Sequence, residues 1–360
     1  MDPLFNPYRT SHKPEAVEAA GLDAVPYPSA DAARPLTLLQ HCPAHGVTPL
    51  IAAESLAERV GMGAVCLKDE RSRMGLGSFK ALGAAYVMAR HAQESGATDM
   101  SQALEGRTYV TASAGNHGMS VAAGSRVFGA RAVIYLAETV PEDFAQRLRE
   151  KGAEVRREGA EYEASMQAAA VASDAENMIL LSDSSWDGYT DLPHILMEGY
   201  TVMAEECAHQ MPAPPTHIFL QAGVGGMAAG FAAKARAAWG DGPKIIVVEP
   251  EAAPALMESV RVGHAVVTAG PVSAMGRLDC KEPSLIALKG LMRDADAFVT
   301  VSEEQAADAV SVLEDHGIST SPSGCAGVAA LLRPSLRDAL GLDDGSTVLA
   351  IISEGSGEPA

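Results

Sequence analysis

Short, largely apolar runs that alternate with helical segments are the feature of this sequence that most restricts its fold. The predicted strands lie at residues 64–70, 109–112, 132–136, 153–155, 178–181, 217–221, 244–249 and 348–352. A strand followed by a helix and then by another strand requires a crossover connection, and such connections produce parallel sheets. The sequence therefore predicts an α/β fold of two domains, each a mostly parallel twisted sheet covered by helices.

The two groups of strands predict how the chain is divided. We expect residues 1–85 and 190–360 to form a larger domain and residues 86–189 to form a smaller, mobile αβ domain. Residues 1–50 are rich in proline and predict an irregular arm, which a short helix at 51–60 follows. Because ligands of such sheets bind beyond the carboxyl ends of the strands, we expect the functional site in the crevice between the domains.

The composition excludes several classes of partner. With a net charge of −19 and no basic block, the chain is not expected to bind nucleic acid or a membrane surface. No apolar run is long enough to span a bilayer, and the first residues lack the pattern of a secretory leader. The five cysteines lack the paired spacing of a metal site, and their odd number favours reduced thiols. These features predict a cytoplasmic protein without a metal site.

Lys80 lies in an unusually apolar setting for a lysine. Phe79 and Leu82 flank it among glycines, directly before a helix predicted at 81–92. Poor solvation disfavours the ammonium form, so we expect a lowered pKa for Lys80. A neutral amine can attack a carbonyl group, which is the reaction of Schiff-base lysines. The alternative is an ordinary lysine at a helix start whose ammonium group reaches the solvent.

A glycine-rich turn at residues 223–227 follows a predicted strand and precedes a predicted helix. Converging backbone N–H groups and the positive end of the helix make such a turn an anion site, most simply for a phosphate. A tight turn without a ligand is one alternative. A second is a dinucleotide site, because Gly223, Gly225 and Ala228, with Glu249 after them, resemble the dinucleotide fingerprint.

Residues 113–118 form another turn at the start of a predicted helix. Its N–H groups and the Ser113 hydroxyl suit a carboxylate, and Asn116 offers an amide to an aromatic hydroxyl, although Ser113 could simply cap the helix. Ser353 follows the last predicted strand, where its hydroxyl could face a ring nitrogen or cap the strand end. A reactive lysine, a phosphate site, a carboxylate site and a ring partner together indicate pyridoxal phosphate (PLP) bound as a Schiff base.

Several of these segments resemble the fold-type II PLP enzymes, the threonine dehydratase and tryptophan synthase β family. The resemblance runs from about residue 48 to 357 and rests on residues 78–83, 113–118 and 223–227 and on Ser353. A second set is similar to the diaminopropionate ammonia-lyase branch. It comprises residues 68–70, 75–83, 183–189, Pro193 and 197–200.

The resemblance implies a role for each matching residue. Lys80 would hold the cofactor, and Asp183 or the freed Lys80 would act as the general base. The implied cofactor-binding residues are Lys80, Phe79, Asn116, Gly223, Val224, Gly225, Gly226, Met227 and Ser353. The implied substrate-binding residues are Ser113, Ala114, Gly115, His117 and Tyr189. A homodimer is also implied by the family.

Two positions depart from the pattern of the lyase branch. In that branch, two aspartates serve as alternative bases for the two substrate enantiomers, and their positions here hold Ala114 and Asp183. Only Asp183 is therefore available, which predicts a preference for the L enantiomer. Residues 321–324 read Ser-Pro-Ser-Gly, where relatives often carry a glutamate before Ser-Gly or Ala-Gly.

The resemblance implies a PLP-dependent carbon–nitrogen lyase that performs α,β-elimination on a small amino acid. The expected substrate is 2,3-diaminopropionate, which would yield pyruvate and ammonia. The nearest alternative is a dehydratase of serine, threonine or hydroxyaspartate. Alternatives of another class are an NAD-dependent oxidoreductase that uses the turn at 223–227 and a PLP-binding protein without catalytic activity.

Overall fold

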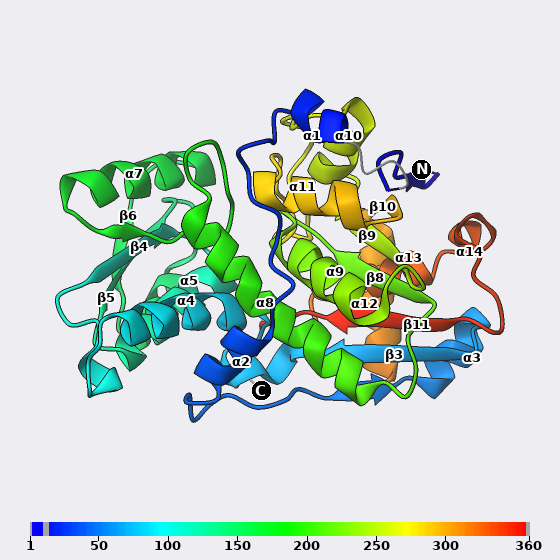
Figure 1. Cartoon of the computed structure of the whole chain (residues 1–360), viewed down its shortest axis with the longest axis horizontal. Helices are drawn as coiled ribbons and strands as arrows, with labels where there is room; N and C mark the ends of the chain where they lie inside the picture. The colour runs from blue at the N-terminus through cyan, green and yellow to red at the C-terminus, as the bar shows by residue number, and fades with distance from the viewer. Residues whose placement is uncertain (1, 10–13, 358–360) are drawn as a thin grey trace.

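The computed structural model describes residues 2–9 and 14–357 and contains a seven-stranded and a four-stranded β-sheet (Figure 1). The strands of the larger sheet are β1 (Leu4–Phe5), β2 (Leu50–Ala52), β3 (Ala64–Asp69), β8 (His217–Gln221), β9 (Lys244–Pro250), β10 (Ala297–Val301) and β11 (Thr347–Ile352). The strands of the smaller sheet are β4 (Thr108–Ala112), β5 (Arg131–Leu136), β6 (Glu154–Arg157) and β7 (Ile179–Leu180).

Most strand pairs are parallel, as the alternation of strands and helices predicts. The larger sheet has the order β1-β10-β9-β8-β11-β3-β2, and its two edge strands, β1 and β2, pair antiparallel. The smaller sheet has the order β6-β5-β4-β7 with every pair parallel. The predicted α/β class with mostly parallel sheets is confirmed.

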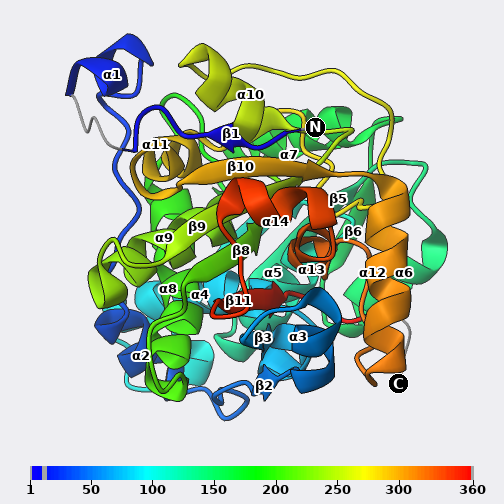
Figure 2. The same ribbon diagram turned by 90° about the vertical axis from the view of Figure 1, so that its right-hand side faces the viewer.

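Helices cover both faces of the larger sheet. The helices are α1 (Pro14–Ala19), α2 (Ala33–Leu39), α3 (Glu54–Val60), α4 (Lys80–Glu94), α5 (Asn116–Val127), α6 (Glu142–Glu150), α7 (Tyr162–Ala175), α8 (Asp191–Gln210), α9 (Gly226–Trp239), α10 (Ala255–Val262), α11 (Leu285–Asp294), α12 (Glu303–Asp315), α13 (Ala326–Leu331) and α14 (Pro334–Leu340), with 3-10 turns η1 (Glu70–Gly75) and η2 (Met100–Gln102). Helices α3, α12, α13 and α14 lie on the side that faces the viewer in Figure 2.

Alternate residues of the central strands enter opposite cores. In β8, Ile218 and Leu220 pack in the apolar cluster formed with α4, α8, α9 and α11. Phe219 lies between them in sequence and packs in the other cluster, with α12, α13 and α14. This period of two explains why a strand that is buried on both faces appears in the sequence as a continuous apolar run.

The two sheets occupy separate parts of the sequence. Every strand of the smaller sheet lies within residues 86–189, and every strand of the larger sheet lies outside that range. Helix α8 begins near the smaller sheet and crosses diagonally in front of the larger domain (Figure 1), and it contributes to the core that spans both sheets. The boundaries of the two domains and the mobility of the smaller one stay predictions.

Two local expectations are wrong. The arm at 1–50 contains helices α1 and α2, since the proline at position 35 falls in the first turn of α2, where a missing N–H costs little. The helix predicted at 51–60 begins at Glu54, because residues 50–52 form β2, in which Ile51 pairs with Leu67 of β3.

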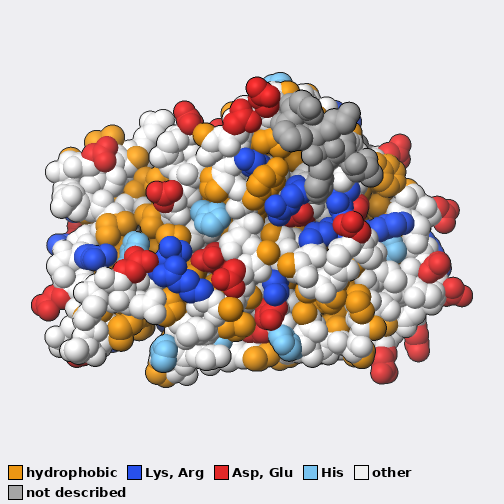
Figure 3. Space-filling view, in the orientation of Figure 1, with side chains coloured by type: hydrophobic (Ala, Val, Ile, Leu, Met, Phe, Trp, Pro, Cys, Tyr) orange, Lys and Arg blue, Asp and Glu red, His pale blue; other side chains and the backbone are white. Residues whose placement is uncertain are grey.

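The surface and the helix lengths bear on possible partners. Acidic and basic side chains are interspersed over the face shown in Figure 3. Within residues 2–9 and 14–357, no helix has the length and apolar character needed to cross a bilayer.

Candidate active site

The loop before Lys80 is attached to the end of strand β11. Ser78 forms an isolated antiparallel bridge with Glu354, and the Phe79 N–H donates a hydrogen bond of 3.2 Å to the Ser353 carbonyl. Gly77 has a φ of 79°, a conformation that glycine adopts without strain. Helix α4 then begins at Lys80, so this side chain lies at the carboxyl end of the larger sheet.

Lys80 and Asp183 form an ion pair at the centre of the candidate site. The Lys80 ammonium donates to Asp183 Oδ2, and each side chain is 20% exposed. Lys80 Nζ also lies 5.3 Å from the centroid of the Phe79 ring and 6.0 Å from that of Tyr200. Both residues were predicted from the sequence to be catalytic, and the fold brings them into contact.

The predicted direction of the Lys80 pKa is wrong for this structure. Burial does act to lower the pKa of Lys80, but the charge and hydrogen bond of Asp183, together with Tyr200, raise the pKa above its ordinary value. The pKa of Asp183 is correspondingly lowered, because the attraction of Lys80 and His117 outweighs the effect of burial. Lys80 therefore carries a proton next to an ionised carboxylate.

The glycine loop, residues 223–227, connects β8 to α9. Gly225 caps the helix with a φ of 97°, and no side chain caps the first N–H groups of α9. A Cβ on Gly225 would lie 2.8 Å from Leu256 Cδ1 and 2.9 Å from Ala287 Cβ, so a larger residue does not fit. The loop therefore presents backbone donors at the positive end of a helix, as an anion site requires.

The glycine loop borders the same space as the Lys80–Asp183 pair. A Cβ on Gly226 would lie 3.7 Å from the Asp183 carbonyl oxygen, and one on Gly223 would lie 3.0 Å from Cys280 Sγ. Burial raises the pKa of the Cys280 thiol to about 12, and the Asp183 carboxylate adds to this effect. The fold therefore brings the glycine loop close to the Lys80–Asp183 pair.

The turn at residues 113–118 opens helix α5 at the carboxyl end of β4. The Ser113 hydroxyl accepts a hydrogen bond of 3.2 Å from the Gly115 N–H. The Asn116 amide donates a hydrogen bond to the carboxylate of Glu354, which follows strand β11 of the larger sheet. Ala114 is partly buried in the core and offers no carboxylate.

Two other predicted substrate residues use some of their polar atoms within the protein. His117 Nε2 lies 2.7 Å from the Leu181 carbonyl, and burial lowers the pKa of His117. The Tyr189 hydroxyl donates to the Leu180 carbonyl at 2.8 Å and accepts from the Ser182 N–H at 3.1 Å. Its ring stacks on the ring of Trp186, so this tyrosine stabilises the turn that carries Asp183.

Gln221 orients the hydroxyl of Ser353. Gln221 Nε2 donates to Ser353 Oγ at 3.0 Å and to the carbonyls of Gly324 and Ile351 at 2.9 and 3.0 Å. Because the Ser353 oxygen accepts this hydrogen, the hydroxyl hydrogen of Ser353 stays available to another acceptor.

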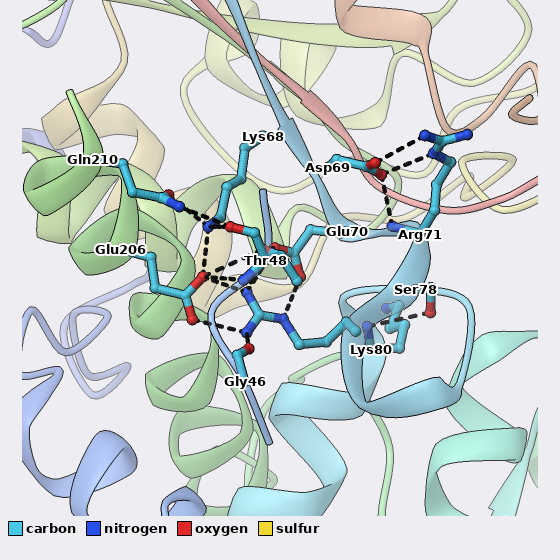
Figure 4. A network of polar contacts seen from close by, with 11 residues as sticks. Gly46, Thr48, Lys68, Asp69, Glu70, Arg71, Ser78, Lys80, Glu206 and Gln210 are labelled. Atoms are coloured by element: carbon cyan, nitrogen blue, oxygen red, sulfur yellow. Dashed lines mark hydrogen bonds and ion pairs between the residues drawn. The ribbon is translucent and has the colours of Figure 1, made fainter. Parts of the chain in front are cut away.

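A buried charged network anchors the segment that leads to Lys80 (Figure 4). Arg73 is fully buried, and its guanidinium donates to both Glu70 oxygens and both Glu206 oxygens at 2.7–2.8 Å. Lys68 donates to Glu206 Oε2 at 2.5 Å, and Thr48 contributes a hydroxyl to Glu70 at 2.6 Å. The network thus joins the amino-terminal arm, β3, η1 and α8 directly before the lysine loop.

The donor set fits PLP. The amine of Lys80, the glycine loop with its uncapped N–H groups and the Ser353 hydroxyl all lie at the carboxyl end of the larger sheet, and a PLP site needs such groups. In the part of the chain that the structure describes, two buried polar atoms near the Lys80–Asp183 pair have no hydrogen-bond partner: His117 Nδ1 and Tyr200 Oη. Buried polar atoms are normally paired, so these atoms indicate a site built to receive a polar ligand.

Sequence reasoning gave no role in the site to several residues. Tyr200 was noted only as part of the segment at residues 197–200, Gln221 lies within a predicted strand, and Glu354 directly follows the predicted Ser353. Arg277 and Cys280 lie in a segment without hydrophobic periodicity, where no local signal marks them. Their positions become apparent once the contacts of Gly115 and Gly223 are known.

Comparisons with known proteins show the family of this chain. The family model described as pyridoxal-phosphate dependent enzyme matches residues 42–354. The chain is 31% identical over 334 residues to diaminopropionate ammonia-lyase of Escherichia coli K12, covering 86% of this chain and 84% of the relative. It is 29% identical over 354 residues to that of Salmonella typhimurium, covering 88% and 87%.

The fold of the chain is also similar to that of a solved diaminopropionate ammonia-lyase structure. The crystal structure of the Escherichia coli diaminopropionate ammonia-lyase, in complex with an aminoacrylate-PLP azomethine reaction intermediate, superimposes with a TM-score of 0.87. The identity is 28%, and the match covers 98% of this chain and 93% of that chain. The resemblance inferred from the sequence motifs is confirmed.

Proposed function

The chain belongs to the pyridoxal-phosphate dependent enzymes, and from this premise we propose that it is an ammonia-lyase that acts on 2,3-diaminopropionate. The observation that carries the proposal is the Lys80–Asp183 pair beside the glycine loop at residues 223–227. The similarity to diaminopropionate ammonia-lyases over 86% and 88% of the chain supports the choice of substrate.

The cofactor would be held by residues of both sheets. Lys80 would hold its aldehyde covalently, with Phe79 packed beside it, and residues 223–227 would bind its phosphate. Asn116 would turn from Glu354 to the ring hydroxyl, and Ser353 would donate its free hydrogen to the ring nitrogen. When bound, PLP supplies a conjugated ring that takes up the negative charge developing at the substrate Cα.

Asp183 and Lys80 carry out the proton transfers of the proposed reaction. The Asp183 carboxylate accepts the proton from the substrate Cα as a general base. Lys80 Nζ donates a proton to the β-amino group, which departs as the first ammonia. Hydrolysis of the unsaturated product then releases the α-nitrogen as a second ammonia. Each substrate molecule therefore yields one pyruvate and two ammonia.

The enantiomer preference follows from a single carboxylate. Asp183 approaches the site from the Lys80 side, whereas Ala114 in the turn at residues 113–118 has no ionisable group. One base can serve one face of the substrate, so we propose that L-diaminopropionate is preferred. Equal kcat/KM values for the two enantiomers would contradict this part of the proposal.

The ratio of products tests the function. Purified protein loaded with PLP is incubated with diaminopropionate, serine, threonine and hydroxyaspartate, and ammonia and 2-oxo acid are both measured. Diaminopropionate should give two ammonia per pyruvate, whereas a dehydratase reaction gives one ammonia per oxo acid. Turnover of a hydroxy amino acid without turnover of diaminopropionate would replace the proposed substrate.

The proposed setting is a homodimer in the cytoplasm. All five cysteines are free in the structure, which supports a reducing compartment. The homodimer rests on the resemblance to the family, and sedimentation at several protein concentrations tests it.

A further inference from the structure

Arg277 extends from the glycine loop to the turn at residues 113–118. Its carbonyl oxygen lies 3.1 Å from the position that a Cβ on Gly223 would take. Its side chain lies against Gly115, where a Cβ would meet Arg277 Cδ at 3.3 Å, Nε at 3.4 Å and Cζ at 3.7 Å. The Arg277 N–H donates to Ser323 Oγ at 3.1 Å, which fixes the backbone of this residue. A cation is therefore held directly over the turn that suits a carboxylate.

The ion pair of Arg277 with Glu354 does not account for this placement. Arg277 Nε lies 3.5 Å from Glu354 Oε2, and the arginine side chain is 44% exposed. Ion pairs of such exposure and distance contribute little to stability. Glu354 also accepts a hydrogen bond from the Ser321 hydroxyl, so it keeps a donor if the arginine leaves and Asn116 turns to the cofactor.

The terminal nitrogens of the Arg277 guanidinium are free to bind a ligand. Among residues 2–9 and 14–357, neither of them has a hydrogen-bond partner. A guanidinium presents paired N–H groups that match the two oxygens of a carboxylate. The positive end of helix α5 begins at Gly115, the residue against which this guanidinium lies.

We propose that Arg277 is a substrate-binding residue that, together with the N–H groups of the turn at residues 113–118, binds the α-carboxylate of the amino acid. The substrate carboxylate takes the place of Glu354 as the partner of the guanidinium. The enzyme therefore requires an ionised α-carboxylate and discriminates against amides and esters. This inference rests on the proposed function only in taking an amino acid as the ligand.

A pair of non-reacting ligands isolates the carboxylate. L-alanine and L-alaninamide differ in that group, and neither carries a leaving group on Cβ. Each is titrated into the PLP-loaded enzyme while the absorption spectrum of the cofactor is followed. We expect the wild-type protein to bind L-alanine at least about tenfold more tightly than L-alaninamide, and Arg277→Gln to reduce this ratio by about tenfold or more.

Two further variants separate binding from folding. Arg277→Lys keeps the charge without the paired donors and should recover part of the ratio. Arg261→Gln changes an arginine of similar exposure on helix α10, where it pairs with Glu258, and should leave the ratio at the wild-type value. If folded, PLP-loaded Arg277→Gln kept the full wild-type ratio, the proposal would be wrong.

Kinetics with diaminopropionate provide an independent measurement. Arg277→Gln should raise KM about tenfold to a hundredfold while kcat stays within about threefold, because the arginine contacts a group that does not react. A loss confined to kcat would contradict the proposal. If diaminopropionate is not a substrate, the alanine ratio still decides the role of Arg277, so the two proposals fail separately.

Discussion

Lys68 and Lys80 lie on either side of one short loop, yet their surroundings differ in kind. Lys68 is fully buried, and its ammonium donates to Glu206 Oε2, to the Thr48 carbonyl and to Gln210 Oε1 at 2.5–2.9 Å (Figure 4). All three of its hydrogens are therefore used. Lys80 is partly exposed and donates to one acceptor, Asp183.

This is the difference that we expect between a structural lysine and a reactive one. A buried charge with every hydrogen bond made is held in one position, and removal of one partner leaves a costly unpaired charge. A lysine with one acceptor, beside the unpaired Tyr200 hydroxyl, can change partners when a ligand binds. The first arrangement holds the loop in place, and the second leaves an amine available for chemistry.

The largest contrast is expected from replacing each lysine. Lys80→Ala removes the amine that would hold the cofactor, so kcat should fall about ten-thousandfold and the visible absorption of the bound cofactor should disappear. Lys68→Met should keep that absorption in the fraction of protein that folds. Absorbance spectra and ammonia release measure both variants, and an unchanged band in Lys80→Ala would remove Lys80 from its role.

The two carboxylates should differ in their effect on stability. Glu206→Ala leaves Lys68 and Arg73 without their shared partner, so the free energy of unfolding should fall by about 3–5 kcal/mol. Asp183→Ala should cost less than Glu206→Ala, because that pair involves one cation and is partly exposed to solvent, at 20% for each side chain. Urea denaturation measures both, and equal losses would break the comparison.

Asp183, whose replacement should cost the less stability of the two carboxylates, should be the more important for activity. Asp183→Asn keeps the size of the side chain but removes the base, so kcat should fall about a hundredfold with little change in unfolding. Asp183→Glu restores a carboxylate and serves as the matched control. If Asp183→Asn kept the wild-type kcat, Lys80 and not Asp183 would be the base that removes the substrate Cα proton.

The smallest expected effect is a pH dependence of stability. Burial acts to raise the pKa of Glu206, but hydrogen bonds and charges from Arg73 and Lys68 lower it overall below the ordinary value of 4.5. A carboxylate with a lowered folded-state pKa contributes stability above about pH 4.5 and loses it as the pH falls through the folded-state pKa.

The wild-type free energy of unfolding should therefore decrease below pH 4.5, by at most about 1.4 kcal/mol per pH unit from this group. The curve of Glu206→Gln should be flatter over the same range, since that side chain does not titrate. Urea denaturation at several pH values between 3 and 6 compares the two proteins. Parallel curves would assign the acid sensitivity to other groups.

Sequence reasoning found the features that local patterns encode. Apolar runs between helices predicted the parallel sheets, and glycines at the end of a strand predicted the loop at residues 223–227. It missed α10, α11 and β10, where the chain between residues 250 and 302 contains long loops and short elements. It also read β2 as helix, because a three-residue edge strand exists through its pairing with β3.

The amino-acid sequence by itself predicted the α/β architecture, the loop that carries Lys80 and the glycine-rich turn at residues 223–227, because each depends on neighbours along the chain. Tertiary structure decided the charge state of Lys80, since Asp183 lies 103 residues away and its attraction outweighs burial. It also placed Arg277 over Gly115 and Gln221 against Ser353. Such contacts follow from packing, which no local pattern contains.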